Sequence, residues 1–595
     1  MSRQVLLINI TRMGDLVQMG TLLQRLQEEW PGVAVDLVVD RRFAEVATLL
    51  PHLRRIITYD FHGLVDESRV AVHDVVSLFR EMTRWAAPLV EARYDRVINL
   101  TFNRRSGFLA SYVGAKEVRG VAAPKDGDVA ICNPWMAYLT DVHNQRRFNR
   151  FNLVDIYALG GSGPGSFAPL SLKILNVARE WARRFFSSQG DESVTWVAVQ
   201  VGASDPIKAW RPESFGHTLV SLSRRLPVGF VFIGTEEERT AILDAQRTYR
   251  QAGGIGPVCD AVGRTTLSEL AALLAECRLL VTNDTGPMHL AVGVGTPVLD
   301  LSVGHVDFHE TGPYGPGHWV VQPDIPCAPC GFDQVCFHHA CKDRLIPGQI
   351  AELCLHVLGQ AAFPSFMSGV RVYRSHMDED ALGSYRLMAG VEPPELQWYG
   401  VFWRRFWFEQ FTGKQSRVPM PTGAPPDLSQ ARRVLAKLQS LGANLVAQAE
   451  EMARLTTQQP LPVHVLRRIH ARENIERKEV LALSMQSPAA ASLAVALVRD
   501  VHSDDGQDLT AMARSRLVTY RRWRARVQAV SDHLSLLEHR DGAANTERVQ
   551  SISLLAEARE RRRSTAPVGG GVELWKSRLT MRRGNCPTPC PSRMS

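Results

Sequence analysis

The residue types best suited to chemistry lie in one short stretch, 281–291, which reads VTNDTGPMHLA. The carboxylate of Asp284, the hydroxyl of Thr285 and Gly286 stand between an apolar run, expected to be a buried strand, and residues expected to begin a helix. A helix N-terminus presents unpaired backbone N–H groups to anions, and glycine lets a ligand approach the backbone. The pattern is typical of a phosphate-binding turn. An ordinary helix cap that binds nothing fits these residues equally well.

A second turn of this kind lies near the start of the chain. Residues 11–15 (TRMGD) follow an expected strand at 5–9 and precede an expected helix at 17–29. Polar groups at the carboxyl ends of parallel strands are where α/β proteins bind ligands. Asp15 is therefore a candidate functional carboxylate, and a helix N-cap is the alternative. The turn lacks the G-x-G-x-x-G pattern, which argues against a dinucleotide oxidoreductase.

The elements that must position these turns form two α/β sets. Further strands are expected at 94–100, 196–201, 228–233 and 296–301, and the glycine-rich segment 160–165 reads as a linker. We expect two facing doubly wound domains with a cleft between them. The predicted division is 1–165, 166–358, a connecting segment 359–426, a helical extension 427–563 and a disordered tail 564–595.

The connecting segment contains a densely aromatic and basic stretch, 398–408. Such a stretch could dock on a membrane surface, and packing as a helix onto the catalytic domains is the favoured alternative. Residues 419–426 are proline-rich, and the pattern beyond 428 predicts several helices.

Bulk composition restricts the function classes. The chain has 595 residues and a net charge of +8, which suits acidic ligands but does not require nucleic acid. No apolar run reaches about 18 residues, so no transmembrane helix is expected. Residues 6–9 are too short to form a signal-peptide core. We therefore expect a cytoplasmic protein whose cysteines are free thiols or metal ligands.

Three motifs together resemble glycosyltransferase family 9, the ADP-heptose:lipopolysaccharide heptosyltransferases. They are ITRMGD at 10–15, KAW at 208–210 and NDTGPMHLA at 283–291, in the order and spacing of that family. The resemblance covers residues 1 to about 358. It implies a GT-B fold, with an acceptor-binding first domain and a nucleotide-sugar-binding second domain. The helical extension departs from the family, whose members usually end near where it starts.

The resemblance also implies roles for individual residues. Asp15 corresponds to the proposed general base, which deprotonates the acceptor hydroxyl. Thr285, Gly286 and Lys208 would offset the charge growing on the leaving diphosphate. Asp284 would bind donor-sugar hydroxyls, Glu238 the adenosine ribose, and His289 would face the same pocket. The alternatives are a surface lysine for Lys208 and a core histidine for His289. The acceptor-side candidates are Thr11, Arg104 and Arg105, and a solvated surface loop is the alternative for either arginine.

The resemblance implies an inverting transfer of heptose, or a related sugar, from an ADP-sugar to a lipopolysaccharide inner-core acceptor. The partners would be a nucleotide sugar and a glycolipid, with peripheral contact at the inner face of the cytoplasmic membrane. No cofactor is required for this chemistry. The alternatives are another donor, a protein or flagellar acceptor, or a non-catalytic scaffold that acts through the helical extension.

A cysteine cluster stands at the end of the catalytic region. Cys327, Cys330, Cys336 and Cys341 have the spacing C-x2-C-x5-C-x4-C, with His338 and His339 between them. This spacing is compatible with structural zinc, and free or redox-labile thiols are the alternative. Cys586 and Cys590 lie in the tail and are not expected to matter for catalysis.

Overall fold

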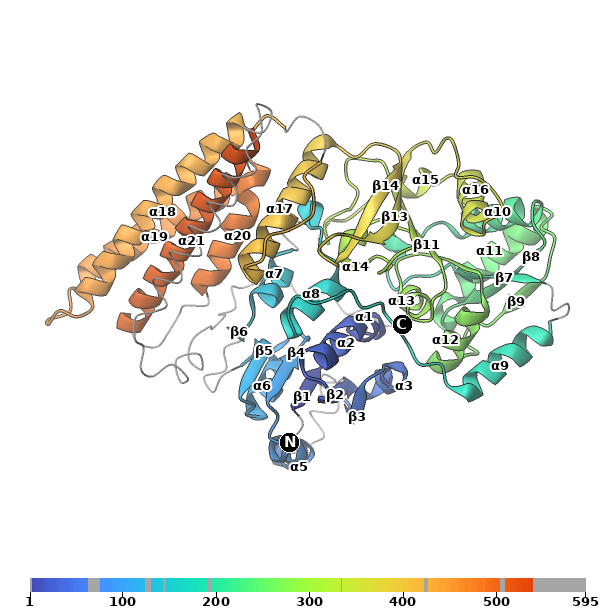
Figure 1. Ribbon diagram of the computed structural model, residues 1–595, viewed down its shortest axis with the longest axis horizontal. Helices are drawn as coiled ribbons and strands as arrows, with labels where there is room; N and C mark the ends of the chain where they lie inside the picture. Colours follow the sequence, from blue (N-terminus) through green and yellow to red (C-terminus); the bar gives the residue numbers. More distant parts are fainter. Residues whose placement is uncertain are drawn as a thin grey trace.

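Figure 1 shows the computed structural model, in which two α/β units and a helical bundle lie side by side. The structure describes residues 3–61, 75–123, 130–142, 146–189, 194–332, 334–421, 426–484, 486–502 and 509–538. The predicted tail 564–595, with Cys586 and Cys590, lies outside the described residues. Within them, no helix combines the length and apolar composition needed to cross a membrane.

The first sheet has the order β3-β2-β1-β4-β5-β6, parallel except for the last pair. Its central strand β1 (Gln4–Ile8) is almost fully apolar and buried, as expected for a strand covered on both faces. The other strands are β2 (Ala34–Asp40), β3 (Leu53–Tyr59), β4 (Arg96–Asn99), β5 (Glu117–Ala122) and β6 (Ala130–Ile131).

The helix expected at 17–29 begins earlier and is divided at Met19 into α1 (Met13–Gln18) and α2 (Gly20–Glu29). The expected linker at 160–165 is also partly helical. Its first two glycines end α8 (Leu153–Gly161), where Gly161 packs against Leu22 and has no room for a side chain. The remaining helices of this unit are α3 (Ala44–Leu49), α5 (Val75–Glu91), α6 (Arg104–Tyr112) and α7 (Pro134–Val142), with short 3-10 turns η1 (Arg41–Phe43) and η3 (Arg146–Phe148).

The second sheet has the order β14-β13-β12-β11-β10-β7-β8-β9. Six strands are parallel: β7 (Thr195–Gln200), β8 (Val228–Ile233), β9 (Val258–Asp260), β10 (Leu279–Thr282), β11 (Val298–Leu301) and β12 (Trp319–Pro323). An antiparallel hairpin, β13 (Val370–Met377) and β14 (Gly383–Ala389), extends the sheet at the β12 edge. The sheet therefore runs past residue 358 into the stretch predicted as a connecting segment. The division into domains stays a prediction.

Helices flank the second sheet on both faces. They are α9 (Asn176–Ser187), α10 (Pro212–Ser223), α11 (Arg239–Gln251), α12 (Leu267–Glu276), α13 (Gly286–Gly293), α14 (Phe308–Thr311), α15 (Ala340–Asp343) and α16 (Pro347–Val357), with the 3-10 turns η4 (Pro206–Lys208) and η5 (Glu236–Glu238). Two doubly wound units that face one another confirm the predicted α/β architecture of GT-B type. They meet where α1 contacts α13.

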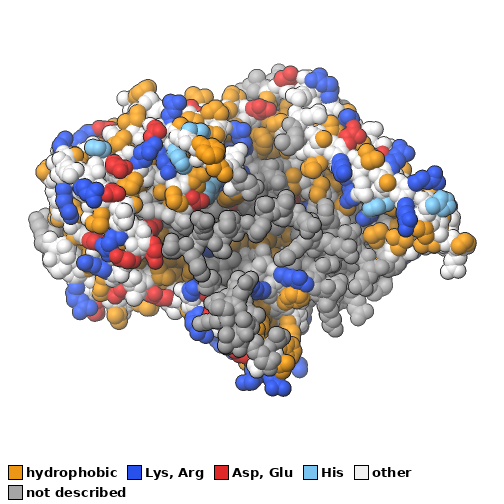
Figure 2. All heavy atoms as spheres, turned by 180° about the vertical axis from the view of Figure 1, so that it is seen from behind, with side chains coloured by type: hydrophobic (Ala, Val, Ile, Leu, Met, Phe, Trp, Pro, Cys, Tyr) orange, Lys and Arg blue, Asp and Glu red, His pale blue; other side chains and the backbone are white. Residues whose placement is uncertain are grey.

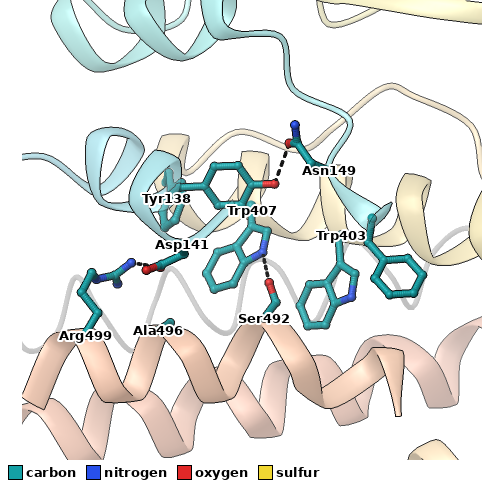
Figure 3. A pocket seen from close by; sticks show the side chains of 10 residues that line it. Tyr138, Asp141, Asn149, Trp403, Trp407, Ser492, Ala496 and Arg499 are labelled. Atoms are coloured by element: carbon teal, nitrogen blue, oxygen red, sulfur yellow. Dashed lines mark hydrogen bonds and ion pairs between the residues drawn. The ribbon is translucent and has the colours of Figure 1, made fainter. Parts of the chain in front are cut away.

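The aromatic stretch 398–408 lies in α17 (Pro394–Thr412), and its rings are buried. It packs between the first unit and the bundle, so the membrane-docking hypothesis for this stretch is wrong and the packing alternative holds. In Figure 3, Trp407 of α17 donates to Ser492 across a 2.8 Å hydrogen bond, and Arg499 pairs with Asp141 of α7. The bundle consists of α18 (Ser429–Leu455), α19 (Val463–Ser484), α20 (Pro488–His502) and α21 (Leu509–Glu538).

Candidate functional site

The turn between β1 and α1 holds Asp15 in the first turn of the helix. Arg12, not Asp15, is the N-cap residue. The Thr11 hydroxyl lies 2.8 Å from Asp15 Oδ2 and 2.9 Å from Asn9 Oδ1, and Asn9 Nδ2 donates to the Asp15 carbonyl at 3.1 Å. Asn9, at the carboxyl end of the central strand, therefore fixes the helical turn that carries the carboxylate.

The Asp15 carboxylate is in an environment that disfavours its charge. Burial raises its pKa above the usual value, and the Thr11 hydroxyl and the charge and backbone N–H of Arg12 only partly oppose that shift. Its charge also acts on Tyr157, a buried residue of α8. A carboxylate with a raised pKa is a stronger base than one in water.

The turn between β10 and α13 holds the second carboxylate. Thr285 is the N-cap of α13, and its hydroxyl lies 3.3 Å from that of Thr282. Asp284 is half-buried and accepts a 2.7 Å hydrogen bond from the Thr311 hydroxyl at the end of α14. Sequence reasoning missed Thr311, because nothing in its local pattern indicates a partner 27 residues away.

Asn283 ties this turn to its neighbours. Its Nδ2 donates to the carbonyls of Val201 and Gly202 at 2.8 and 3.2 Å, and its Oδ1 accepts the Trp210 N–H at 2.9 Å. The side chain thus joins the ends of β10 and β7 to the segment that follows Lys208. The Asn283 side chain is fully buried. These hydrogen bonds explain why an amide stands directly before Asp284 and Thr285.

Lys208 ends η4, beside the same turn. Its charge acts on His289 and Asp300, which places the ammonium near the start of α13. Among the described residues its side chain forms no hydrogen bond or ion pair. The backbone of Gly304 approaches Ile207 so closely that a Cβ would lie 2.4 Å from its carbonyl oxygen, with φ at +68°. Only glycine suits that position.

The cysteine segment lies behind the Lys208 turn. The Nζ of Lys342 donates to the Pro206 carbonyl at 2.8 Å, and the Lys342 backbone carbonyl accepts from the Trp210 indole N–H at 2.9 Å. The Cys330 N–H donates to the Gly304 carbonyl. Within the described ranges, no group of three Cys, His, Asp or Glu side chains is arranged to hold a metal ion. The four cysteines of the cluster are free thiols, namely Cys327, Cys330, Cys336 and Cys341. This arrangement gives the zinc hypothesis no support.

Glu238 lies where the carboxyl ends of β7 and β8 meet. Its carboxylate accepts from Gln200 Nε2 at 3.1 Å and from the Thr235 N–H at 2.8 Å. A Cβ on Gly202 would lie 2.3 Å from Glu238 Oε1, so glycine is needed for this approach. The contacts settle which of the three consecutive glutamates faces the strand ends, because Glu236 instead pairs with Arg239.

His289 brings the two units together. A Cβ on Gly14 would lie 3.0 Å from His289 Cδ2, so the helix that carries Asp15 packs directly on this imidazole. Burial lowers the pKa of His289 to about 4, which keeps the ring neutral near pH 7. Its Nδ1 is buried and accepts no hydrogen bond from the described residues. Met13 similarly packs on Gly286, where a Cβ would lie 2.1 Å from its terminal methyl.

Asp300 is a buried carboxyl that the sequence did not single out. It pairs with Thr282 across the β10–β11 ladder and is fully buried, with neither oxygen hydrogen-bonded among the described residues. Burial, and then the charge of Asp284, raise its pKa well above the usual value. The neutral form is therefore favoured, and it limits the negative charge around Asp284.

The acceptor-side arginines lie at the start of α6. Arg104 stacks on Phe108 at 5.3 Å, and Arg105 donates weakly to the Phe61 carbonyl at 3.4 Å. Both are exposed. The loop before them is joined to the Asp15 turn, because the Ile10 N–H donates to Thr101 Oγ1 at 3.0 Å. Neither arginine bonds to Thr11 or Asp15 within the described residues, so their role stays a prediction.

Comparison with known proteins agrees with this arrangement. Residues 82–340 match the model of glycosyltransferase family 9 (heptosyltransferase). This part of the chain belongs to glycosyltransferase family 9. The lipopolysaccharide heptosyltransferase 1 of Pseudomonas aeruginosa is 25% identical over 333 residues, which are 55% of this chain and 86% of that protein. The lipooligosaccharide heptosyltransferase 2 of Haemophilus influenzae is 21% identical over 324 residues, 50% of this chain and 82% of that protein.

Solved structures of family 9 are also similar. A glycosyltransferase family 9 protein from Veillonella parvula matches with a TM-score of 0.48 and 20% identity, over 60% of this chain and 98% of that one. The ADP-heptose lipopolysaccharide heptosyltransferase II of E. coli matches with a TM-score of 0.45 and 19% identity, over 60% and 99%. The matched region is that of a glycosyltransferase, and the helical bundle lies beyond it.

Proposed function

We propose that this glycosyltransferase transfers a heptose, or a closely related sugar, from an ADP-sugar to an anionic acceptor of the lipopolysaccharide inner core. The observation that carries the proposal is the packing of the Asp15 helix against the N-terminal end of α13, with Gly14 on His289 and Met13 on Gly286. Asp15, as the base on one unit, would thereby act opposite a phosphate-binding turn on the other.

The donor would bind along the strand ends of the second unit. Glu238, which is held by Gln200, would accept hydrogen bonds from ribose hydroxyls. Thr285, the N–H groups that begin α13, and Lys208 would hold the diphosphate, whose charge grows as the glycosidic bond breaks. Asp284, oriented by Thr311, would accept hydrogen bonds from the hydroxyls of the sugar.

The acceptor would bind to the first unit. Asp15 would remove the proton of the attacking hydroxyl as that oxygen bonds to the anomeric carbon, opposite the leaving ADP. Thr11 donates to the same carboxylate and therefore orients it. Arg104 and Arg105 are exposed and suited to phosphate or carboxylate groups of an acceptor. Such an acceptor would bring the glycolipid, and with it the inner membrane face, to this side of the enzyme.

The donor assignment is tested by measuring ligand-induced stabilisation of the purified full-length protein. ADP-heptose, ADP-glucose, UDP-glucose and GDP-mannose are compared by thermal shift, and ADP release is followed with a lipopolysaccharide core acceptor. We expect selective stabilisation by ADP-heptose and acceptor-dependent ADP release. Preference for a UDP- or GDP-sugar would refute the donor, and turnover with a protein acceptor alone would refute the acceptor.

A further inference from the structure

The outer half of the helical bundle contains a cavity of about 530 Å³, remote from the interface between the two α/β units. Residues from α18, α19, α20 and α21 all line it. Its volume lies in the range of small-molecule sites, and helical bundles build such sites between facing helices. The inner half of the same bundle is instead filled by apolar side chains, including Leu445, Val480 and Trp523.

The lining changes character along the bundle axis. On α19, Val463 and Leu466 lie near the outer end, whereas Arg477 lies about 20 Å further along the helix, at 1.5 Å per residue. On α21, Met512 lies near the outer end and Arg516 deeper. On both helices the innermost lining residue is therefore an arginine, whereas Arg467 lies beside Leu466 near the outer end.

Guanidinium groups supply the charge of the lining. Arg477 and Arg516 line its inner end and Arg467 its outer end, and no Asp or Glu lines the cavity. Behind the wall, the fully buried Glu473 holds Arg516 at 2.8 Å and also accepts from Tyr520. Within the described part of the chain, neither Arg467 nor Arg477 forms an ion pair, and the Nε of Arg477 is buried without an acceptor. An anion in the cavity would balance the charge of the Arg477 guanidinium, which has no acidic partner among the described residues.

The outer end exposes apolar side chains to water. Leu461, Val463 and Leu509 line the cavity and are 41%, 46% and 39% exposed. Figure 2 shows hydrophobic side chains beside Lys, Arg and His at the tip of the bundle. An apolar ligand body in the cavity would cover this surface, and the hydrophobic effect would favour its binding.

We propose that the bundle binds an amphiphilic anion. Its carboxylate or phosphate head pairs with Arg477 at the inner end, and its apolar chain lies between Leu466 and Met512. Because the cavity lies between four helices, it suits a single small molecule better than a segment of another protein. The proposal does not depend on the donor or the acceptor of the glycosyl transfer.

The test uses the full-length protein with dodecyl phosphate and dodecanoate, each titrated calorimetrically below its critical micelle concentration. We expect one saturable site, at least tenfold weaker binding of uncharged dodecanol, and at least tenfold weaker binding of both anions to the variant Arg477→Gln. The matched control is Arg468→Gln, an exposed arginine of the same helix outside the cavity lining, which should bind as the unchanged protein does.

Circular dichroism establishes that each variant is folded. If Arg477→Gln unfolds, Leu461→Glu, at an exposed lining position, carries the test, because the added carboxylate repels an anion and should weaken its binding as well. The proposal is overturned if neither anion saturates, if the folded test variant binds as tightly as the control, or if dodecanol binds equally well. Binding only to phosphatidylglycerol vesicles, or only to an acidic amphipathic peptide, overturns it as well.

Discussion

The β1–α1 turn and the β10–α13 turn are built alike but treat their carboxylates differently. Each follows a buried parallel strand, and each carries a half-buried aspartate within two residues of a glycine, where a short helix begins. Asp15 stands among apolar groups with Thr11 as its side-chain partner and has a raised pKa. Asp284 stands near Lys208 and the buried Asp300 and is held by Thr311. One environment suits proton transfer, and the other suits orientation of a polar ligand.

The largest expected effect comes from Asp15→Asn. If Asp15 is the base, kcat should fall about 10³-fold, within the usual range for a general base. Stabilisation by ADP should be kept, because the second unit is unchanged. Since burial raises the folded-state pKa of Asp15, its ionised form opposes folding above that pKa, and the variant should not lower Tm at pH 7. Unchanged kcat would remove Asp15 from the mechanism.

The second effect concerns the leaving group. Lys208→Met should lower kcat about 10²-fold, because one cationic donor to the diphosphate is lost. Lys208→Arg should recover part of the rate. The matched control is Lys173→Met, because Lys173 is an exposed lysine away from this turn. The activity of this variant should match that of the unchanged enzyme. A rise in KM for the acceptor alone would contradict the assignment to the donor side.

A smaller effect is expected at Thr311. Thr311→Val removes the hydroxyl that donates to Asp284, and a hydrogen bond to a charged group contributes about 1.5–3 kcal/mol. We expect the KM for the nucleotide sugar to rise about tenfold, with little change in the affinity for ADP, which lacks the sugar. Thr311→Ser keeps the donor and should restore the KM. An equal loss of ADP affinity would mean that Thr311 supports the whole turn.

The smallest effect concerns the pH dependence of kcat/KM, which should respond to the Asp15 turn and not to the Asp284 turn. Thr11→Val removes a hydrogen bond that lowers the pKa of Asp15, so that pKa rises. Because the base acts only when deprotonated, the acid limb of kcat/KM should move to higher pH, by about 0.5–1 unit for a hydrogen bond of about 1 kcal/mol. Thr11→Ser should leave the limb in place. The same shift in Thr311→Val would erase the distinction between the turns.

Much of this arrangement could be predicted from local pattern. The strand expected at 228–233 is β8. The polar residues after the parallel strands also led to the prediction that Asp15, Glu238 and Asp284 lie near the carboxyl ends of their strands. Burial on both faces makes such strands continuous apolar runs, which a sequence reveals directly. The residue at which the turn ends and the helix of Asp15 begins was harder to predict, because α1 begins without a side-chain cap.

Other features depend on contacts distant in the sequence. Asp300 reads as one polar residue in an apolar strand, and only the ladder with β10 places it beside Asp284. The antiparallel hairpin β13–β14 was missed because polar residues interrupt the apolar ones in both strands, which therefore lack a continuous apolar signal. The aromatic density of 398–408 was ambiguous, since a membrane and a protein interior favour the same side chains.

The β13–β14 hairpin and α17 also determine how the molecule can move. The chain leaves the second sheet at β14 and returns in α17 to the first unit, where Arg404 donates to the Arg150 carbonyl and pairs with Asp378 beside β13. The bundle is fixed to α7 of the first unit by Arg499. A rotation between the units would therefore move the bundle together with the first unit. A small rotation where the units meet would become a large displacement at the outer end of the bundle.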